Sequence, residues 1–422
     1  MSRKRPEMIV KEGHQQWETA DFRGAARTPL RVAYFSPLPP APSGIADYSA
    51  ALLPYLAEYA DLTLFTAEPD RVAPRLTQQF DVRPLASYPA CRFEFDVALY
   101  QMGNSAQHEA MYPYLLRYPG VVVLHDYSLH HFLTYRTVGQ GNMPGYSREL
   151  GFVLGGKGAA LVYEIRRGRQ APPLFELPLN DRLLSASLGV MSHSQYAAER
   201  LRRQRPDRPV QRIPPMIEPQ KGRHRRHELN WPDEAIIFAS LGQVTAAKQV
   251  DMALRAFQRL RQTIPNAYYL VVGEQFHDVD LHTLAHELGV AEYVHFTGHV
   301  ADLPTFIDWI YTADIVINLR HPTVGETSAT ALRALAAARP LIVFDQGWYS
   351  EIPDSACAKM PPMDDAALLG VMRQLALEPP RRQQMGQSGK TYVTRHCHPQ
   401  KVAGETIRFL HTTQHSIKEK YA

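Results

Sequence analysis

Two charged turns in the second half of the sequence carry side chains that could act on a phosphorylated substrate. Lys248 lies between a short apolar segment and a run with helical periodicity. Arg320 and Glu326 lie in a polar turn that ends where a helix is expected to open, near Thr327 or Ser328. A charged turn at the carboxyl end of a strand, leading into a helix, is where an open parallel sheet binds an anionic ligand. These turns therefore predict an enzyme for a phosphorylated substrate.

The first half of the sequence places polar groups in similar positions. Gly44 ends a loop rich in proline just before a helix, so its backbone amides and the helix dipole could hold a phosphate. Gln101 and Asn104 follow one apolar segment, and His125 and Asp126 follow another. An imidazole at such a strand end can donate to a sugar hydroxyl or a phosphate oxygen, and a neighbouring carboxylate can bind hydroxyl groups. We expect these side chains at the edge of a cleft.

A metal site is the competing interpretation for the histidines of this region. His130 and His131 follow Asp126 closely, but the His-Glu-x-x-His spacing is missing and no cysteine is near in sequence. Asp278 and Asp280 precede a helical run, which N-capping explains without a metal. We therefore expect neither a metal ion nor another cofactor.

Alternating apolar segments and amphipathic runs must position these side chains. One series extends over 31–191 and a second over 235–344. Continuous apolar strands between helices imply parallel sheets that are covered on both faces. We therefore predict an α/β protein with two tandem Rossmann-like doubly wound domains, whose sheets face each other across an interdomain cleft.

The predicted domain organisation follows from where these series begin and end. It consists of a polar N-terminal tail at 1–28, a first Rossmann-like domain at 29–216, a basic linker at 217–232, a second Rossmann-like domain at 233–397, and a C-terminal helix and tail at 398–422, with the helix returning to the first domain.

Composition limits the class of protein. The chain has 422 residues, 45% hydrophobic and 21% charged, and no stretch approaches the roughly 20 apolar residues that span a bilayer. Three widely spaced cysteines and a polar N-terminus fit a cytoplasmic protein. A net charge of +4 is too small for a nucleic-acid binder. Basic clusters at 166–169 and 200–208 could support weak contact with the inner face of a membrane.

Taken in order, these motifs resemble the large family of retaining, nucleotide-sugar-dependent glycosyltransferases, glycosyl transferases group 1, with the GT-B fold. Gly44 matches the glycine-rich first loop, in which Ser43 replaces the usual second glycine. His125 matches the histidine near the transferred sugar, and Lys248 matches the lysine of the diphosphate site. Glu326 falls at, or one residue after, the glutamate that contacts the sugar.

The resemblance extends to the nucleotide, with two departures. Gly298, His299 and Val300 match the turn that holds the base. Gln243 stands where the family has an arginine, which removes one cation from the diphosphate site. Arg333 stands where the family has the glutamate that binds the ribose. An arginine can donate to a ribose oxygen, but it cannot accept from a hydroxyl.

Two further side chains complete the predicted site. We expect Arg320 to supply the missing positive charge, unless it is simply a salt-bridged arginine at a strand end. Glu351 lies on a loop after a strand, where it could line the cleft or cap a helix. In the implied mechanism, Lys248 and Arg320 stabilise the departing diphosphate together with the helix end near Thr327.

The resemblance implies transfer of a hexose, preferably mannose, from a nucleoside diphosphate sugar to a saccharide or lipid-linked acceptor in polysaccharide biosynthesis. It also implies retention at the anomeric carbon and catalysis without a metal. A nucleotide-sugar epimerase is one alternative, since it can share two such domains. A non-catalytic subunit that binds a sugar nucleotide is the other, because two family residues are replaced.

Overall fold

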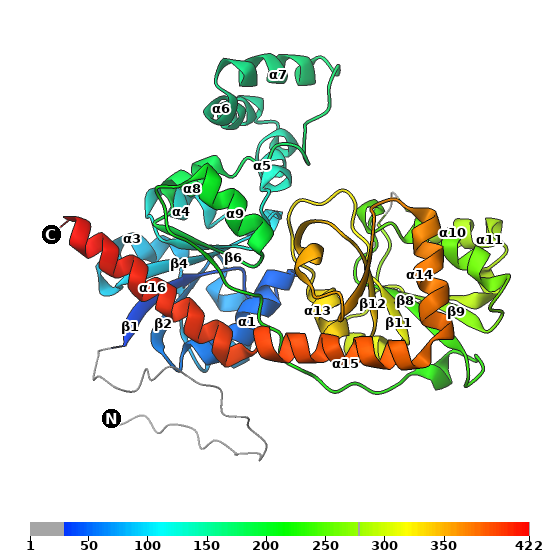
Figure 1. Cartoon of the computed structure of the whole chain (residues 1–422). Helices are drawn as coiled ribbons and strands as arrows, with labels where there is room; N and C mark the ends of the chain where they lie inside the picture. Colours follow the sequence, from blue (N-terminus) through cyan, green and yellow to red (C-terminus); the bar gives the residue numbers. More distant parts are fainter. Residues whose placement is uncertain (1–28, 277–278, 422) are drawn as a thin grey trace.

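The computed structural model describes residues 29–276 and 279–421. The predicted tail at 1–28 and the predicted capping residue Asp278 lie outside these ranges. Within them the chain forms two α/β halves that lie side by side, each built on a parallel sheet, as predicted (Figure 1).

The first sheet has seven parallel strands in the order β3-β2-β1-β4-β5-β6-β7. The strands are β1 (Leu30–Phe35), β2 (Ala60–Thr66), β3 (Asp81–Pro84), β4 (Val97–Met102), β5 (Val121–Leu124), β6 (Gly189–Ser192) and β7 (Val210–Arg212). The helices of this half are α1 (Gly44–Leu56), α2 (Pro74–Thr77), α3 (Tyr88–Cys91), α4 (Tyr112–Arg117), α5 (His130–Arg136), α6 (Met143–Leu154), α7 (Gly156–Arg166), α8 (Asp181–Ala186) and α9 (Gln195–Gln204).

The second sheet has six parallel strands in the order β10-β9-β8-β11-β12-β13. They are β8 (Ile236–Leu241), β9 (Ala267–Val272), β10 (Val294–Phe296), β11 (Ile315–Ile317), β12 (Leu341–Phe344) and β13 (Cys357–Met360). The helices are α10 (Val250–Arg261), α11 (Leu281–Glu287), α12 (Leu303–Thr312), α13 (Ala329–Ala336), α14 (Asp365–Leu377) and α15 (Pro379–His396), followed by α16 (Pro399–Tyr421).

Each sheet is packed on both faces. Along β1, Val32 and Tyr34 belong to one apolar cluster, whereas Ala33 and Phe35 belong to the cluster on the opposite face. Successive side chains of a strand point to opposite faces, so a strand buried on both sides reads as a continuous apolar run. This packing leaves the loops at the carboxyl ends of the strands as the places where polar side chains can meet a ligand.

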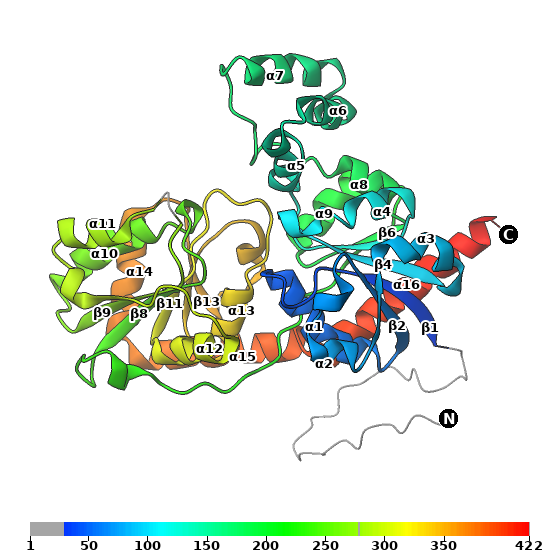
Figure 2. The same ribbon diagram turned by 180° about the vertical axis from the view of Figure 1, so that it is seen from behind.

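The last helix returns to the first half, as predicted. Helix α15 runs along the second half against α13 and β13, and α16 crosses to pack on α1 (Figures 1 and 2). Val402, Ala403 and Leu410 of α16 lie in the same apolar cluster as Val32 of β1. The C-terminal segment therefore joins the two halves, in addition to the strand-to-strand connection through 213–235.

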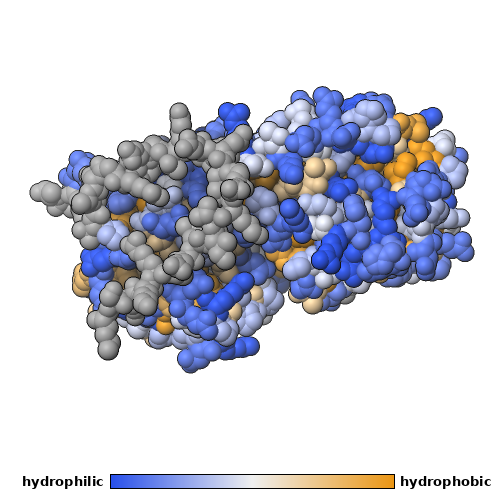
Figure 3. Space-filling model, turned by 90° about the horizontal axis from the view of Figure 1, so that it is seen from below, coloured by the Kyte–Doolittle hydropathy of each residue, from blue (hydrophilic) through white to orange (hydrophobic). Residues whose placement is uncertain are grey.

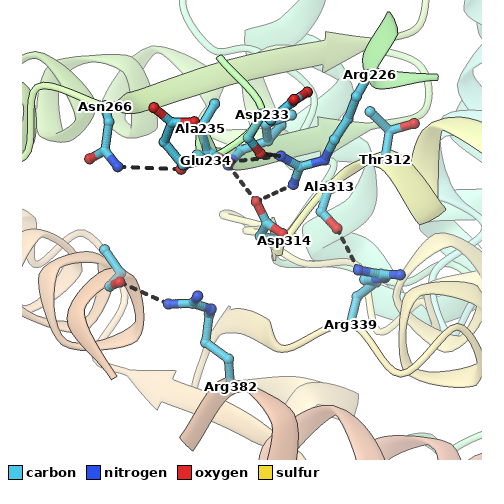
Figure 4. Close-up of polar contacts among 12 residues, drawn as sticks. Arg226, Asp233, Glu234, Ala235, Asn266, Thr312, Ala313, Asp314, Arg339 and Arg382 are labelled. Atoms are coloured by element: carbon cyan, nitrogen blue, oxygen red, sulfur yellow. Dashed lines mark hydrogen bonds and ion pairs between the residues drawn. The ribbon is translucent and has the colours of Figure 1, made fainter. Parts of the chain in front are cut away.

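That connection is anchored where it enters the second half (Figure 4). Arg226 donates to the backbone oxygen of Ala235 at 2.9 Å, and its guanidinium lies 2.6 Å from Asp314 Oδ2. The same carboxylate oxygen accepts from the backbone N–H of Ile237 at 2.8 Å. Arg339 donates to Ala313 O beside it. These contacts fix the amino ends of β8 and β11, opposite the edge that carries the predicted site.

The surface of the second half is mostly polar on the face seen from below (Figure 3). Apolar side chains gather there in separate patches. Among the described residues, no helix has the length and apolar content needed to cross a bilayer.

Candidate functional site

A cavity of about 560 Å³ lies between the two halves. The first half contributes the loop before α1, the loops after β4 and β5, and His193 after β6. The second half contributes Leu303 and the beginning of α13. Six predicted site residues line the cavity: Gly44, Asn104, His125, Asp126, Thr327 and Arg333.

Two helix beginnings face this cavity from opposite halves. Ser43 caps α1 by accepting from Ile45 N at 3.2 Å, and Ser328 caps α13 by accepting from Ala331 N at 3.1 Å. No described atom lies within 4 Å of the position that a Cβ on Gly44 would take, so the space beside this loop is open. Because the amino end of a helix carries unpaired N–H groups and a positive dipole end, both walls favour an anion.

Lys248 lies against the first turn of α13. Its Nζ donates to Leu241 O at 2.8 Å, and a Cβ on Gly242 would lie 2.8 Å from Nζ and 3.3 Å from Thr330 Oγ1. Gly242 has φ +87°, so glycine provides both the backbone conformation and the room for the lysine. Burial, and then the charge of Arg320, lower the pKa of Lys248 to about 7. An anion beside it would favour its charged form.

The Glu326 carboxylate is held on three sides. Its Oε1 lies 2.9 Å from Arg320 Nε, and its Oε2 accepts from Thr323 Oγ1 at 2.9 Å and from Val324 N at 2.8 Å. Arg320 is therefore paired with Glu326, which was the alternative to a free cation for the diphosphate. Neither residue is among those that line the cavity in the described part of the chain, but the charges of both act on Asp126, which does line it.

Asp126 brings a carboxyl group to the first-half wall. Its Oδ2 accepts from the backbone N–H of Asn104 at 2.8 Å. Burial raises the pKa of Asp126 to about 6, and the nearby charge of Glu326 adds to this, whereas the Asn104 N–H and the charge of Arg320 oppose it. A carboxyl group with this pKa exchanges a proton close to neutral pH and can bind a hydroxyl as acceptor or donor.

Both ring nitrogens of His125 are already hydrogen-bonded within the first half. Nε2 lies 2.8 Å from Gln101 Oε1, and Nδ1 lies 3.0 Å from Nε2 of His193. His193 Nδ1 lies 2.9 Å from the backbone oxygen of Ile213, which can only accept. The proton of His193 therefore sits on Nδ1, its Nε2 accepts from His125 Nδ1–H, and His125 Nε2 needs a donor.

The amide of Gln101 supplies that donor if its nitrogen and oxygen are exchanged. The buried Gln101 Nε2 has no hydrogen-bond partner among the described residues, and exchange places it on His125 Nε2. Burial, together with the neighbouring His193, lowers the pKa of His125 well below its usual value, and burial lowers that of His193 to about 4. His125 therefore stands as a neutral ring held in place, and its contact with a sugar remains a prediction.

His193 was not predicted as a site residue. It follows β6 as His125 follows β5, so its position at a strand end was the available signal. His130 and His131, the histidines of the competing metal interpretation, have structural partners. His130 contacts Leu177 O and Tyr146 Oη at 2.7 Å each, and His131 Nδ1 lies 3.1 Å from Asn104 Nδ2.

Arg333 faces an acidic residue of the other half. Arg333 and Asp47 both line the cavity, the first from α13 and the second from the first turn of α1. Burial lowers the pKa of Arg333 and raises that of Asp47, and each is partly offset by the charge of the other. Asp47 thus brings a carboxylate close to the arginine that replaces the family's ribose-binding glutamate.

The remaining predicted residues lie outside the cavity. Glu351 accepts from Gln195 N at 2.9 Å and from Tyr196 N at 2.7 Å, so it caps the beginning of α9 across the domain junction. Both of its oxygens are thus engaged in capping, which was one of the two roles expected for it. Gln243, Gly298, His299 and Val300 lie on exposed or half-buried turns at the carboxyl edge of the second sheet, away from the cavity lining.

Comparison with known proteins relates the second half of the chain to a transferase family. Residues 223–392 match the family model of glycosyl transferases group 1. This part of the chain is therefore similar to glycosyltransferases. No curated protein matched the sequence of the chain.

Solved structures share its fold. A sucrose-phosphate synthase from Thermosynechococcus elongatus superposes with a TM-score of 0.66 at 15% identity, over 91% of this chain and 99% of that one. HepE of Anabaena in complex with UDP-glucose gives 0.61 at 15%, over 91% and 100%. WaaG, a glycosyltransferase of lipopolysaccharide biosynthesis, gives 0.57 at 16%, over 88% and 98%. The two parallel-sheet domains of this chain thus have the GT-B fold.

The position of Lys248 leads to a direct test. With lysines labelled at ¹³Cε, NMR titration of the protein should show one lysine with a pKa of about 7, which is absent in Lys248→Gln. In Arg320→Gln this pKa should rise, because a like charge that disfavours the ammonium is removed. Arg255→Gln, on the exposed side of α10, is the matched control and should leave the titration unchanged. A Lys248 pKa near its usual value in the unaltered protein would contradict this description of the site.

Proposed function

We propose that the transferase moves a hexose from a nucleoside diphosphate sugar to a saccharide or lipid-linked acceptor, with retention at the anomeric carbon. The observation that carries this proposal is the cavity between the halves, with a helix beginning on each wall and Lys248 behind one of them. A diphosphate is the ligand that such a set of N–H groups and one ammonium recognises.

In the proposed reaction, the second half stabilises the leaving group. The amides at the start of α13, Thr327 and the Lys248 ammonium receive the charge that develops on the diphosphate as the glycosyl bond breaks. This charge stabilisation requires no metal ion. Arg320 acts at one remove, because it is paired with Glu326 and holds that carboxylate in place.

The first half positions the sugar and the acceptor. Asp126 binds hydroxyl groups of the hexose, and Asn104 marks the acceptor side of the cavity. The acceptor hydroxyl attacks the anomeric carbon from the face that the diphosphate leaves, and its proton passes to the departing phosphate oxygen. The configuration is therefore kept without a covalent intermediate. Holding both substrates in this geometry supplies much of the rate, and closure of the two halves excludes water. Among donors, GDP-mannose and UDP-glucose are the first to test.

The test is a donor panel followed by product analysis. Purified enzyme with one donor and a mixture of saccharide acceptors should release nucleoside diphosphate and form an α-linked product from an α-linked donor. Lys248→Ala should lower kcat/KM roughly 10²–10³-fold, the loss expected when one stabiliser of developing negative charge is removed. Lys390→Ala, on an exposed part of α15, is the matched control and should leave it unchanged.

Other outcomes of this panel would replace the proposal. Conversion of the donor to a second sugar nucleotide without acceptor would show an epimerase. Binding without any turnover of donor would show a sugar-nucleotide-binding subunit. Equal activity of Lys248→Ala and the unaltered enzyme would remove the assigned role of the lysine.

For a lipid-linked acceptor, we propose that α6 and α7 contact an anionic membrane surface. These helices stand away from the body of the first half (Figures 1 and 2). Lys157, Arg166 and Arg167 are exposed. Tyr163, which lies between Lys157 and the two arginines in the sequence, is 50% exposed. Co-sedimentation with vesicles that contain phosphatidylglycerol should exceed that with neutral vesicles and should fall in Arg166→Gln/Arg167→Gln. Equal sedimentation with both kinds of vesicle would remove this contact.

A further inference from the structure

The two halves touch each other directly beside the cavity that lies between them. The backbone N–H of Ser128, in the loop after β5, donates to Val324 O at 3.1 Å. The backbone N–H of Val324 in turn donates to Glu326 Oε2 at 2.8 Å. Asp126 lies two residues before Ser128, and Glu326 lies two residues after Val324. One backbone contact therefore sets the position of the loop that carries Asp126 relative to the turn that carries Glu326.

Gly325 allows this turn to approach the first half closely. A Cβ on Gly325 would lie 2.7 Å from Cβ of Tyr127 and 3.2 Å from Cε1 of Tyr196. Gly325 also has φ +79°, a backbone conformation that other residues rarely adopt. Tyr127 is fixed from its own side, because the buried Asn180 donates from Nδ2 to Tyr127 O at 2.7 Å. A side chain at position 325 would therefore push the turn away from the first half.

Glu351 makes a second contact between the halves, from the loop after β12 to the start of α9. Its carboxylate accepts from Gln195 N at 2.9 Å and from Tyr196 N at 2.7 Å, the first two N–H groups of that helix. The third, Ala197 N, donates to Ser194 Oγ at 3.0 Å within the first half. The amino end of a helix has N–H groups without helical partners and a partial positive charge. A carboxylate of the second half therefore completes a helix of the first half.

These contacts lie next to the cavity without forming its wall. Val324, Gly325 and Glu351 are not among the described residues that line the cavity, whereas Asp126 and Thr327 line it from opposite halves. We propose that Gly325 and Glu351 are positioning residues, whose contacts with the first half hold Asp126 in place opposite the start of α13. The proposal rests on the proposed function of the cavity, because it concerns the alignment of the two walls of that site.

The ionisation of Asp126 reports on this alignment. Burial raises the pKa of Asp126 to about 6; the Asn104 N–H opposes this shift, the charge of Glu326 adds to it and that of Arg320 opposes it. If the halves move apart, the carboxyl group becomes more hydrated and the charge of Glu326 is removed, and both changes lower its pKa. The simultaneous loss of Arg320 has the opposite sign but is the smaller effect of the two charges. A weakened contact between the halves should therefore lower the pKa of Asp126.

The experiment is an NMR titration of the full chain with aspartates labelled at ¹³Cγ, without any substrate. The unaltered protein should show a signal with a pKa of about 6 that is lost in Asp126→Asn. Gly325→Ala and Glu351→Ala should each lower this pKa toward the usual aspartate value of about 3.9. Gly289→Ala is the control for backbone strain, since Gly289 has φ +66° and no described atom within 4 Å of an added Cβ. Glu287→Ala, on the exposed side of α11, is the control for the lost carboxylate. Both controls should leave the pKa unchanged.

The same variants have an expected effect on the proposed transfer reaction. Gly325→Ala and Glu351→Ala should each lower kcat roughly 10- to 100-fold, because a displacement of about 1 Å far from the chemistry can cost this much. Gly289→Ala and Glu287→Ala should keep the kcat of the unaltered protein.

The outcomes separate the positioning role from the transfer reaction. An unchanged Asp126 pKa in both Gly325→Ala and Glu351→Ala would overturn the positioning role even if the donor is turned over as proposed. An equal fall of this pKa in Gly289→Ala would show a general effect of strain and would overturn it as well. A lowered pKa in the two contact variants alone would support it even if no donor is turned over. Circular dichroism checks that each variant is folded, and Glu351→Ala decides the question if Gly325→Ala does not fold.

Discussion

The arrangement of the site depends on the contacts of the Glu326 carboxylate. It bonds to the N–H of Val324 and the hydroxyl of Thr323 and pairs with Arg320. The turn between β11 and α13 is thereby fixed, and with it the direction in which the start of α13 points. The same carboxylate also offsets the positive charge of Arg320. Without it, Arg320 would lower the pKa of Lys248 further.

Among the residues that the structure describes, none forms an ion pair with Lys248. Lys248 is bonded to a neutral carbonyl and its pKa is lowered by burial and by Arg320, so its charged form is disfavoured until an anion arrives. The beginnings of α1 and α13 add unpaired N–H groups to the same region. A site that is incomplete without negative charge is suited to a leaving group that gains negative charge, because the stabilisation increases as the reaction proceeds.

The sequence was sufficient for the central strands and for the helices around the site. The predicted start of α13 at Thr327 or Ser328 is confirmed by the Ser328 cap, and Asp280 caps α11 as expected. The strands β3, β7 and β13 were not predicted. All three lie at sheet edges, and β3 and β7 are mostly polar or half-exposed, so the apolar run that reveals a central strand is missing.

Side-chain partners that join distant segments could not be predicted. The pairing of Glu351 with the start of α9 and the approach of Asp47 to Arg333 both cross the domain junction. The apolar periodicity of a sequence predicts its helices and strands, but it does not predict how two domains lie relative to each other. His193 lies in the same half as its partner His125 but 68 residues away, and no local pattern shows that contact. A position at the end of a strand identified candidate site residues. Only the three-dimensional structure showed which of their polar atoms are already hydrogen-bonded within the protein.

The most direct measurement is a crystal structure of the enzyme with an intact nucleoside diphosphate sugar. The diphosphate should lie at the start of α13, within hydrogen-bond distance of Lys248 Nζ, and the hexose should lie beside Asp126. A donor bound elsewhere, or bound here with Lys248 still directed only at Leu241 O and away from the phosphates, would contradict this account.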